Sequence, residues 1–130
     1  MSEPIHQEVS FKASPDAIYA ALMTTKGHSD FTGEPAEMSA KVGGKFTAYS
    51  GYISGINIEL IKDKLIVQAW RGSGWPAGHW SVITYRLAKS GKGTKLNFTH
   101  AGVPDAEVDS IASGWHTHYW ERLAKLPAAA

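Results

Sequence analysis

The second half of the chain alternates aromatic residues with glycine and proline, and this pattern restricts the folds that are open to it. Glycine and proline fix turns, while aromatic residues at alternating positions between turns form one apolar face of a strand. The densest aromatic segment is the last, residues 114–120, which reads Gly-Trp-His-Thr-His-Tyr-Trp. So many rings predict either a packed core or the wall of an enclosed cavity.

Size and charge indicate one globular domain without a polyanionic partner. The chain has 130 residues, 43% of them hydrophobic and 19% charged, and this composition is typical of a single domain over residues 1–130. The 13 basic and 12 acidic side chains are scattered and give a formal charge of +1. Because there is no basic patch, we expect neither a nucleic-acid nor a membrane partner.

Cysteine and histidine usage bears on compartment and metal binding. Cysteine is absent, which removes disulfides and thiolate ligands and fits a reducing compartment, so we expect a cytoplasmic protein. The start, Met-Ser-Glu-Pro, does not read as a secretory signal. His116 and His118 are two apart on a predicted helix and cannot share a metal as an i, i+4 pair does. We expect no metal and no cofactor.

The amino-terminal third predicts a strand and two short helices. Residues 5–11 alternate apolar and polar side chains, as in a half-buried strand. Ser14 and the following Pro-Asp favour a helix start there. Residues 24–31 predict a second short helix, which Gly27 weakens and Gly33 ends.

The rest of the chain predicts a run of strands and one long helix. The β-type segments are residues 45–50, 56–60, 65–71, 79–88 and 94–100. They predict an antiparallel meander, and residues 104–126 predict a helix of roughly six turns at 3.6 residues per turn. Strands followed by a terminal helix favour an α+β fold in which a curved sheet wraps against that helix. In it, Phe98 and Trp115 face each other, and Gly114 allows a close approach by a strand or ligand.

Several short motifs recur in the order and spacing of a known superfamily. They are Phe31-Thr32, Gly43-Gly44-Lys45-Phe46, Trp70-Arg71, Trp75-Pro76-Ala77-Gly78-His79, Ile83-Thr84, Gly102-Val103-Pro104, and Gly114-Trp115 with Tyr119. Through them nearly the whole chain resembles the START-like (SRPBCC) helix-grip superfamily, and within it the carboxy-terminal domain of activators of the heat-shock-protein-90 ATPase. The resemblance implies a sheet gripping the last helix, often around an apolar small molecule, and it also implies a chaperone partner.

The expected ligand site lies between sheet and helix. Its candidate lining residues are Phe46, Tyr85, Phe98, Trp115 and Tyr119, with His79 and His100 at a polar end. We expect the two histidines on the inner face with Ser81 between them. They either orient a ligand or act as acid and base near neutral pH, or they are satisfied core histidines bonded to the backbone. The aromatic residues are likewise open to two interpretations, cavity wall or plain core.

Tryptophans on the other surfaces suggest a second kind of site. Trp80 shares the parity of the water-facing strand positions, and Trp75 and Trp120 are also candidates for exposure. Exposed tryptophans often anchor protein partners, so Trp75 and Trp80 are predicted partner-binding residues. The alternative is that they cover a loop and a helix.

These observations suggest three functions, given in order of preference. The first is a non-enzymatic domain that encloses an apolar small molecule, with no catalytic residues. The second is a chaperone cofactor or other protein-interaction module, favoured if side chains fill the cavity and Trp75 or Trp80 is exposed. The third is a weak enzyme that uses His100 or His79, favoured only by a perturbed titration of His100 inside an open cavity.

Overall fold

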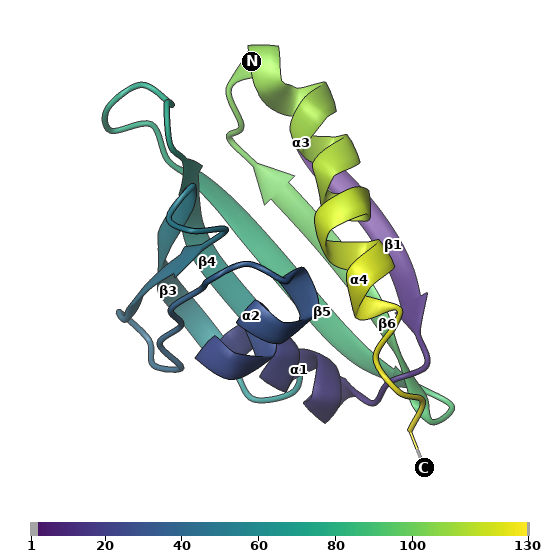
Figure 1. The fold of residues 1–130 in the computed structure, drawn as a ribbon. Coiled ribbons are helices and arrows are strands. Elements are labelled where there is room, and N and C mark those ends of the chain that lie inside the picture. The colour runs from purple at the N-terminus through teal and green to yellow at the C-terminus, as the bar shows by residue number, and fades with distance from the viewer. Residues whose placement is uncertain (1–2, 130) are drawn as a thin grey trace.

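A computed structural model describes residues 3–129 and shows one antiparallel sheet with its helices on one face (Figure 1). The strands are β1 Ile5–Phe11, β2 Lys45–Ala48, β3 Ile53–Ile61, β4 Leu65–Gly72, β5 Ser81–Ser90 and β6 Gly93–Ala101. The helices are α1 Pro15–Met23, α2 Thr25–Thr32, a 3₁₀ turn η1 Asp105–Glu107, α3 Val108–Trp115, a π-helical turn η2 His116–Trp120, and α4 Glu121–Leu123. The expected α+β helix-grip fold is confirmed.

The sheet has six strands in the order β1-β6-β5-β4-β3-β2. β2 to β6 form the expected meander, and β1 joins it by pairing with β6, so the first and last strands lie side by side. The register pairs Tyr85 with Phe98 and Ile83 with His100. Since side chains alternate between faces, these four all point to the helical side, where they are buried. The predicted facing of these two strands is therefore confirmed.

The short helices follow the sequence signals. Ser14 is the N-cap of α1 with Pro15 at the first helical position, and its hydroxyl bonds to Asp16 at 2.5 Å rather than to the backbone. α2 ends at Gly33, whose left-handed conformation (φ +75°) is the one that glycine adopts without a Cβ penalty. α2 packs against α4 and α1 packs on β5 and β6, so both helices help to cover the sheet (Figure 1).

The carboxy-terminal helix differs from the expected uninterrupted α-helix. It starts as a 3₁₀ turn, continues as α3, widens into the π turn η2 and finishes in α4. The rings of Trp115 and Trp120 stack across this turn, with centroids 5.5 Å apart and planes at 18°. In an α-helix residues five apart point in clearly different directions at 100° per residue, whereas i→i+5 bonding brings them onto one face. Trp120 is therefore 2% exposed, and its expected exposure is wrong.

A glutamine from the first strand holds this part of the helix in place. Gln7 Nε2 donates to the carbonyl oxygen of Ala112 at 2.9 Å, and Gln7 Oε1 accepts from Nε1 of Trp120 at 2.6 Å. One side chain thus satisfies a helix carbonyl and an indole N–H.

Within residues 3–129, no helix combines the length and apolar character that a bilayer crossing requires.

Candidate functional site

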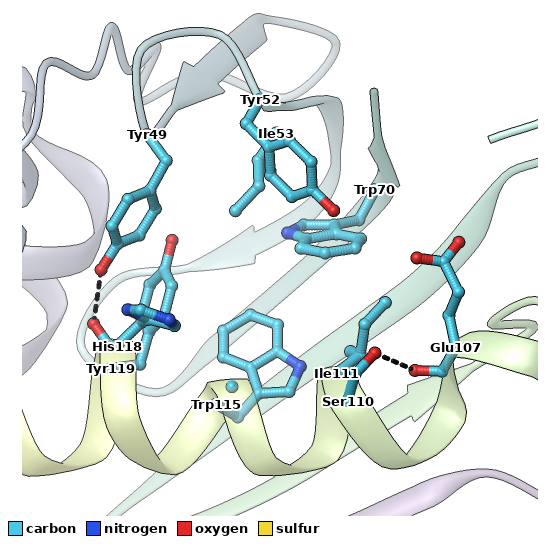
Figure 2. Close-up of a pocket in the computed structure, with 11 residues that line it drawn as sticks. Tyr49, Tyr52, Ile53, Trp70, Glu107, Ser110, Ile111, Trp115, His118 and Tyr119 are labelled. Atoms are coloured by element: carbon cyan, nitrogen blue, oxygen red, sulfur yellow. Dashed lines mark hydrogen bonds between the residues drawn. The ribbon is translucent and has the colours of Figure 1, made fainter. Parts of the chain in front are cut away.

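A pocket of about 450 Å³ lies between the carboxy-terminal helix and the turn that joins β2 to β3. We call it the helix–turn pocket. Its lining residues are Tyr49, Tyr52, Ile53, Trp70, Glu107, Ser110, Ile111, Gly114, Trp115, His118 and Tyr119. Figure 2 shows the helix forming the floor, with Tyr49 and Tyr52 descending from the turn above it. The volume lies within the range of small-molecule sites.

The turn above the pocket has an uncommon backbone. Tyr49 and Ser50 are consecutive non-glycine residues with positive φ, at 51° and 57°, and such conformations usually need support from the surrounding structure. Tyr49 has that support, since its hydroxyl donates to the carbonyl oxygen of His118 at 2.8 Å and its ring meets the His118 ring edge-on at 5.5 Å. The bond closes one end of the helix–turn pocket (Figure 2).

Of the seven predicted ligand-site residues, two line this pocket. Trp115 and Tyr119 form part of its floor, with ring centroids 4.5 Å apart. Phe98 packs against the other side of Trp115 at 4.5 Å, and Tyr85 lies 5.2 Å from Phe98. Phe98 and Trp115 thus face each other as expected. Tyr85 and Phe98 are buried core residues outside the pocket lining, because the helix packs directly onto the middle of the sheet.

Phe46 is also buried away from the pocket. It lies on β2 opposite Gly55 of β3, and a Cβ on Gly55 would collide with the Phe46 ring. Because Gly55 has no side chain, the Phe46 ring occupies the space beside its Cα. Phe46 is therefore a core residue at the sheet edge and does not line the helix–turn pocket.

His100 sits in the core within a short polar chain. Nε1 of Trp115 donates to Nδ1 of His100 at 3.0 Å, and Nε2 of His100 lies 2.8 Å from Oγ of Ser81. Ser81 Oγ in turn donates to the carbonyl oxygen of Trp70 at 2.6 Å. Burial lowers the pKa of His100 to about 3, because the charged imidazolium would lose its hydration. His100 is thus a satisfied core histidine adjoining Ser81 as expected, and it lies outside the pocket lining.

His79 is placed differently from the expectation. It precedes β5, which begins at Ser81, and its side chain is only partly buried. Its Nε2 lies 2.8 Å from the carbonyl oxygen of Gly102, and its ring meets Trp75 edge-on at 5.5 Å. The expected polar end formed by His79 and His100 together is wrong, because the strand starts two residues later and leaves His79 in the preceding loop.

A buried histidine that no sequence motif indicated supports the pocket floor. His28 on α2 has Nδ1 3.0 Å from the carbonyl oxygen of Leu22 and Nε2 2.8 Å from the hydroxyl of Tyr119. Since a carbonyl only accepts, Nδ1 carries the proton and, in the neutral ring, Nε2 accepts from Tyr119. Burial lowers the pKa of His28 and raises that of Tyr119. The only sequence signal was a lone histidine among the residues of a short helix.

The two tryptophans predicted to bind partners have opposite surroundings. Trp75 is 5% exposed and packs on Trp70 at 5.5 Å, so its expected exposure is wrong. Its loop folds back because Arg71 Nη2 donates to the carbonyl oxygen of Trp75 at 2.9 Å. Trp80 is 44% exposed on the outer sheet face, as predicted. The Arg71 guanidinium lies 5.7 Å from the centre of the Trp80 ring, within cation–π range.

Gly114 opens onto the helix–turn pocket rather than onto a strand. A Cβ at this position would have His118 Cδ2 as its nearest neighbour, at 3.7 Å. The expected close approach by a strand is therefore wrong. What the glycine does is leave room in the pocket wall between Ser110 and His118.

The comparisons with known sequences agree on one family. A sequence profile of the activator of Hsp90 ATPase homolog 1-like proteins matches residues 12–128. The chain is 34% identical over 114 residues to the human activator of 90 kDa heat shock protein ATPase homolog 1, covering 88% of this chain and 34% of that protein. A Dictyostelium discoideum homologue of that activator is 30% identical over 87% of this chain and 30% of its own length. The chain spans about a third of the length of these relatives.

Solved structures show the same fold. An HSP90 activator from Plasmodium falciparum superposes with a TM-score of 0.89 at 24% identity, over 94% of each chain. The Aha1 dimer from Colwellia psychrerythraea has a TM-score of 0.77 at 21% identity, over 95% of this chain and 99% of that one. Taken with the profile match over nearly the whole chain, these relatives show that the chain belongs to the activator of Hsp90 ATPase homolog 1-like family.

Proposed function

We propose that this chain is a chaperone cofactor that binds an Hsp90-type chaperone and stimulates its ATPase. The observation that carries the proposal is the 34% identity to the human activator over 88% of this chain. The chain then works by binding and has no catalytic residues of its own. In support, His100 is buried with both ring nitrogens engaged, so it offers no free acid or base to a substrate. We place the protein in the cytoplasm on the absence of cysteine.

The outer sheet face provides the chaperone contact in this proposal. Trp80 is 44% and Val82 41% exposed, and they alternate with Ser81 and Ile83, which are buried beneath the helices. Arg71 stands over the Trp80 ring, which places a cation beside an apolar anchor. Tryptophan and arginine are the residues that most often dominate binding energy. A chaperone surface with a pocket for an indole ring beside a carboxylate would complement this outer patch, which we define as Arg71, Trp80 and Val82.

The experiment is a titration of the purified chain into an Hsp90-type chaperone, read by calorimetry and by ATPase rate. We expect saturable binding and a faster ATPase. Trp80→Ala should weaken binding by about tenfold or more, as truncation of an anchor does, while Lys92→Ala in the β5–β6 turn is the matched surface control. Absence of binding by the wild-type chain would reject the proposal. Binding that survives Trp80→Ala unchanged would reject the outer patch as the contact.

A second function is favoured by the helix–turn pocket. About 450 Å³ lined by five aromatic rings is enough space and apolar surface for a small molecule. This site, rather than the sheet centre, is where an apolar ligand would bind, because Tyr85 and Phe98 are closed off by the helix. Displacement of a fluorescent dye by apolar compounds tests this ligand-binding function. The displacement should be lost in a Gly114→Leu variant, whose side chain fills the pocket. No displacement by any compound would count against this function.

A further inference from the structure

The helix–turn pocket combines aromatic walls with one carboxylate. Tyr49, Tyr52, Trp70, Trp115 and Tyr119 supply rings from three parts of the chain, the β2–β3 turn, strand β4 and the carboxy-terminal helix. Glu107, at the start of that helix, is the acidic side chain among the lining residues. Figure 2 shows its carboxylate rising from the helix toward the side of the pocket that Trp70 forms.

Among residues 3–129, no side chain forms an ion pair with the carboxylate of Glu107. Within residues 3–129 the ion pairs are Lys26 with Asp30 and Lys95 with Glu8, and neither lies at the pocket. The contact that Glu107 makes with Ser110 uses its backbone carbonyl, which accepts from the serine hydroxyl at 3.1 Å. The side-chain oxygens therefore remain available to a ligand. The lining also includes the imidazole of His118, which lies at the opposite end of the pocket beside Tyr49 (Figure 2).

Aromatic faces and a carboxylate favour the same kind of ligand group. The face of an indole or phenol ring carries partial negative charge and attracts ammonium groups within about 6 Å. A carboxylate adds an opposite charge in a partly desolvated site, where Coulomb attraction is stronger than in bulk water. An anion would instead meet repulsion from both.

We infer that the helix–turn pocket binds an organic cation, an apolar or aromatic body that carries an ammonium group, with the body between Trp115 and Trp70 and the ammonium group beside Glu107. This inference rests on the second function proposed above and gives its ligand a charge. It differs from the expectation of a neutral apolar ligand with two histidines at its polar end, because this pocket carries a carboxylate and excludes His79 and His100.

The experiment uses two probes of the same shape. Phenyltrimethylammonium and tert-butylbenzene differ only by a quaternary nitrogen in place of a carbon, so their difference in affinity measures the effect of charge. Dissociation constants come from ¹⁵N-resolved NMR titrations of the full chain, in which the shifts of the tryptophan indole N–H groups locate the bound probe. We expect phenyltrimethylammonium to bind about five- to tenfold more tightly, with the largest shift at Trp115.

Two variants identify the group responsible. Glu107→Gln should reduce this preference about threefold or more, because it keeps the side-chain size and removes the charge while the aromatic faces remain. Asp109→Asn, an exposed acid two residues along, is the matched control and should keep the full preference. Equal binding of both probes by the wild type, or a preference that Glu107→Gln leaves undiminished, overturns the inference while leaving an apolar-ligand function intact. Failure of both probes to bind rejects the pocket function itself, and with it this inference.

Discussion

The indole N–H of Trp115 donates to Nδ1 of His100 across 3.0 Å, and this bond ties the carboxy-terminal helix to the middle of the sheet. Because Nδ1 accepts, the neutral ring carries its proton on Nε2, which donates to Oγ of Ser81. A second proton on the ring would point an N–H at the indole N–H. Burial and these hydrogen-bond partners together keep His100 neutral. The free energy of unfolding should therefore depend on pH.

Acidification should destabilise the fold below about pH 6.5. The pKa of His100 is about 3 when folded and about 6.5 when unfolded, so between these values the unfolded chain takes up a proton that the folded chain does not. The stabilisation present above pH 6.5 is thus lost as the pH falls. At pH 5 the loss from His100 is about 2 kcal/mol, and His28, whose pKa is also lowered, adds to it. Urea unfolding at pH 7.5 and pH 5 measures this difference.

His100→Asn isolates the contribution of this histidine. An asparagine oxygen can still accept from Trp115, but it does not titrate. The variant should be less stable at pH 7.5 and should show a smaller loss between pH 7.5 and pH 5, by about 2 kcal/mol. His116→Asn, at an exposed position, should keep the wild-type dependence. A full pH dependence in His100→Asn would show that His100 is not the group responsible.

Trp115→Phe should be strongly destabilising. It leaves Nδ1 of His100 buried without a donor and removes part of a ring that contacts Phe98 and Trp70. An orphaned buried acceptor and lost ring volume together cost about 2–4 kcal/mol. Trp80→Phe, on the outer face, should change the free energy of unfolding by less than about 0.5 kcal/mol. Similar effects of the two variants in urea unfolding would contradict the assigned role of the indole N–H.

Gln7→Leu should loosen the π turn. It removes the acceptor of Trp120 Nε1 and the donor to the Ala112 carbonyl, at a cost of about 2–4 kcal/mol for two partly buried groups. Amide hydrogen exchange should accelerate over residues 116–120. His6→Leu changes the neighbouring residue on the exposed face of the same strand and should have little effect. Equal protection of these amides in both variants would mean that Gln7 does not hold the turn.

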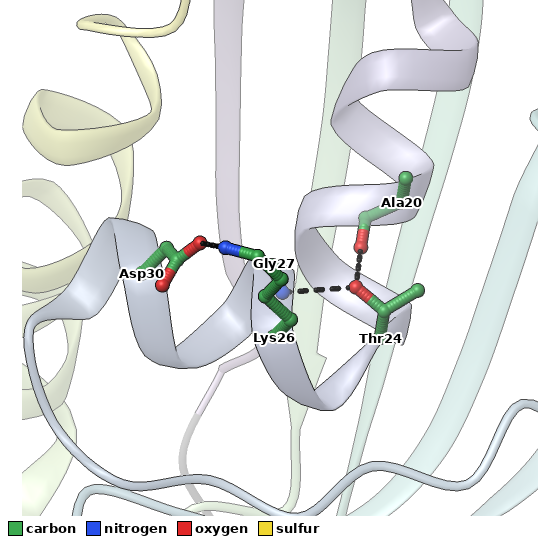
Figure 3. Close-up of polar contacts among 5 residues, drawn as sticks. All are labelled: Ala20, Thr24, Lys26, Gly27 and Asp30. Carbon is green, nitrogen blue, oxygen red and sulfur yellow. Dashed lines mark hydrogen bonds and ion pairs between the residues drawn. The ribbon is translucent and has the colours of Figure 1, made fainter.

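Two helix glycines should respond oppositely to alanine. Gly27 lies where α2 meets the end of α1, and a Cβ there would stand 2.6 Å from both the Ala20 carbonyl oxygen and Thr24 Oγ1. Figure 3 shows this crowded junction, where Thr24 Oγ1 donates to Ala20 O and accepts from the Gly27 amide. Gly27→Ala should therefore cost about 1–3 kcal/mol.

Gly114→Ala is the comparison, since a Cβ there meets nothing closer than 3.7 Å. It should stabilise the fold by about 0.5–1 kcal/mol through helix propensity and a less flexible unfolded chain. Thermal unfolding of the two variants tests both signs. A destabilised Gly114→Ala or a stabilised Gly27→Ala would contradict this packing around the two glycines.

Removal of the carboxy-terminal helix should prevent folding. A chain ending at Pro104 would expose the inner sheet face, including Phe98 and Tyr85, to water. Far-ultraviolet circular dichroism should show loss of the native spectrum and of a cooperative melt. A chain ending at Pro127 keeps the helix and should melt as the full chain does. A folded, soluble fragment ending at Pro104 would overturn the architecture.

The sequence determined those features that depend on local periodicity. A period of two assigned β5 and β6 their inner and outer faces, so Phe98 and Trp115 were correctly predicted to meet and Trp80 to be exposed. Glycine and proline signals placed both short helices and the end of α2 at Gly33. These features can be predicted because each follows from the conformation of a few consecutive residues.

Only the tertiary structure decided the surroundings of the remaining site residues. Trp120 turns inward because an i→i+5 turn places it on the face of Trp115, where its ring stacks on Trp115 and its indole N–H donates to Gln7. A period of 3.6 residues cannot predict such a turn. Trp75 is buried by a loop that folds back onto Trp70, and His28 meets Tyr119 from 91 residues away. The pocket likewise lies beside the β2–β3 turn and not at the predicted place over the sheet centre. Such contacts join distant parts of the chain, and their free energy depends on how those parts fit together, which no local pattern records.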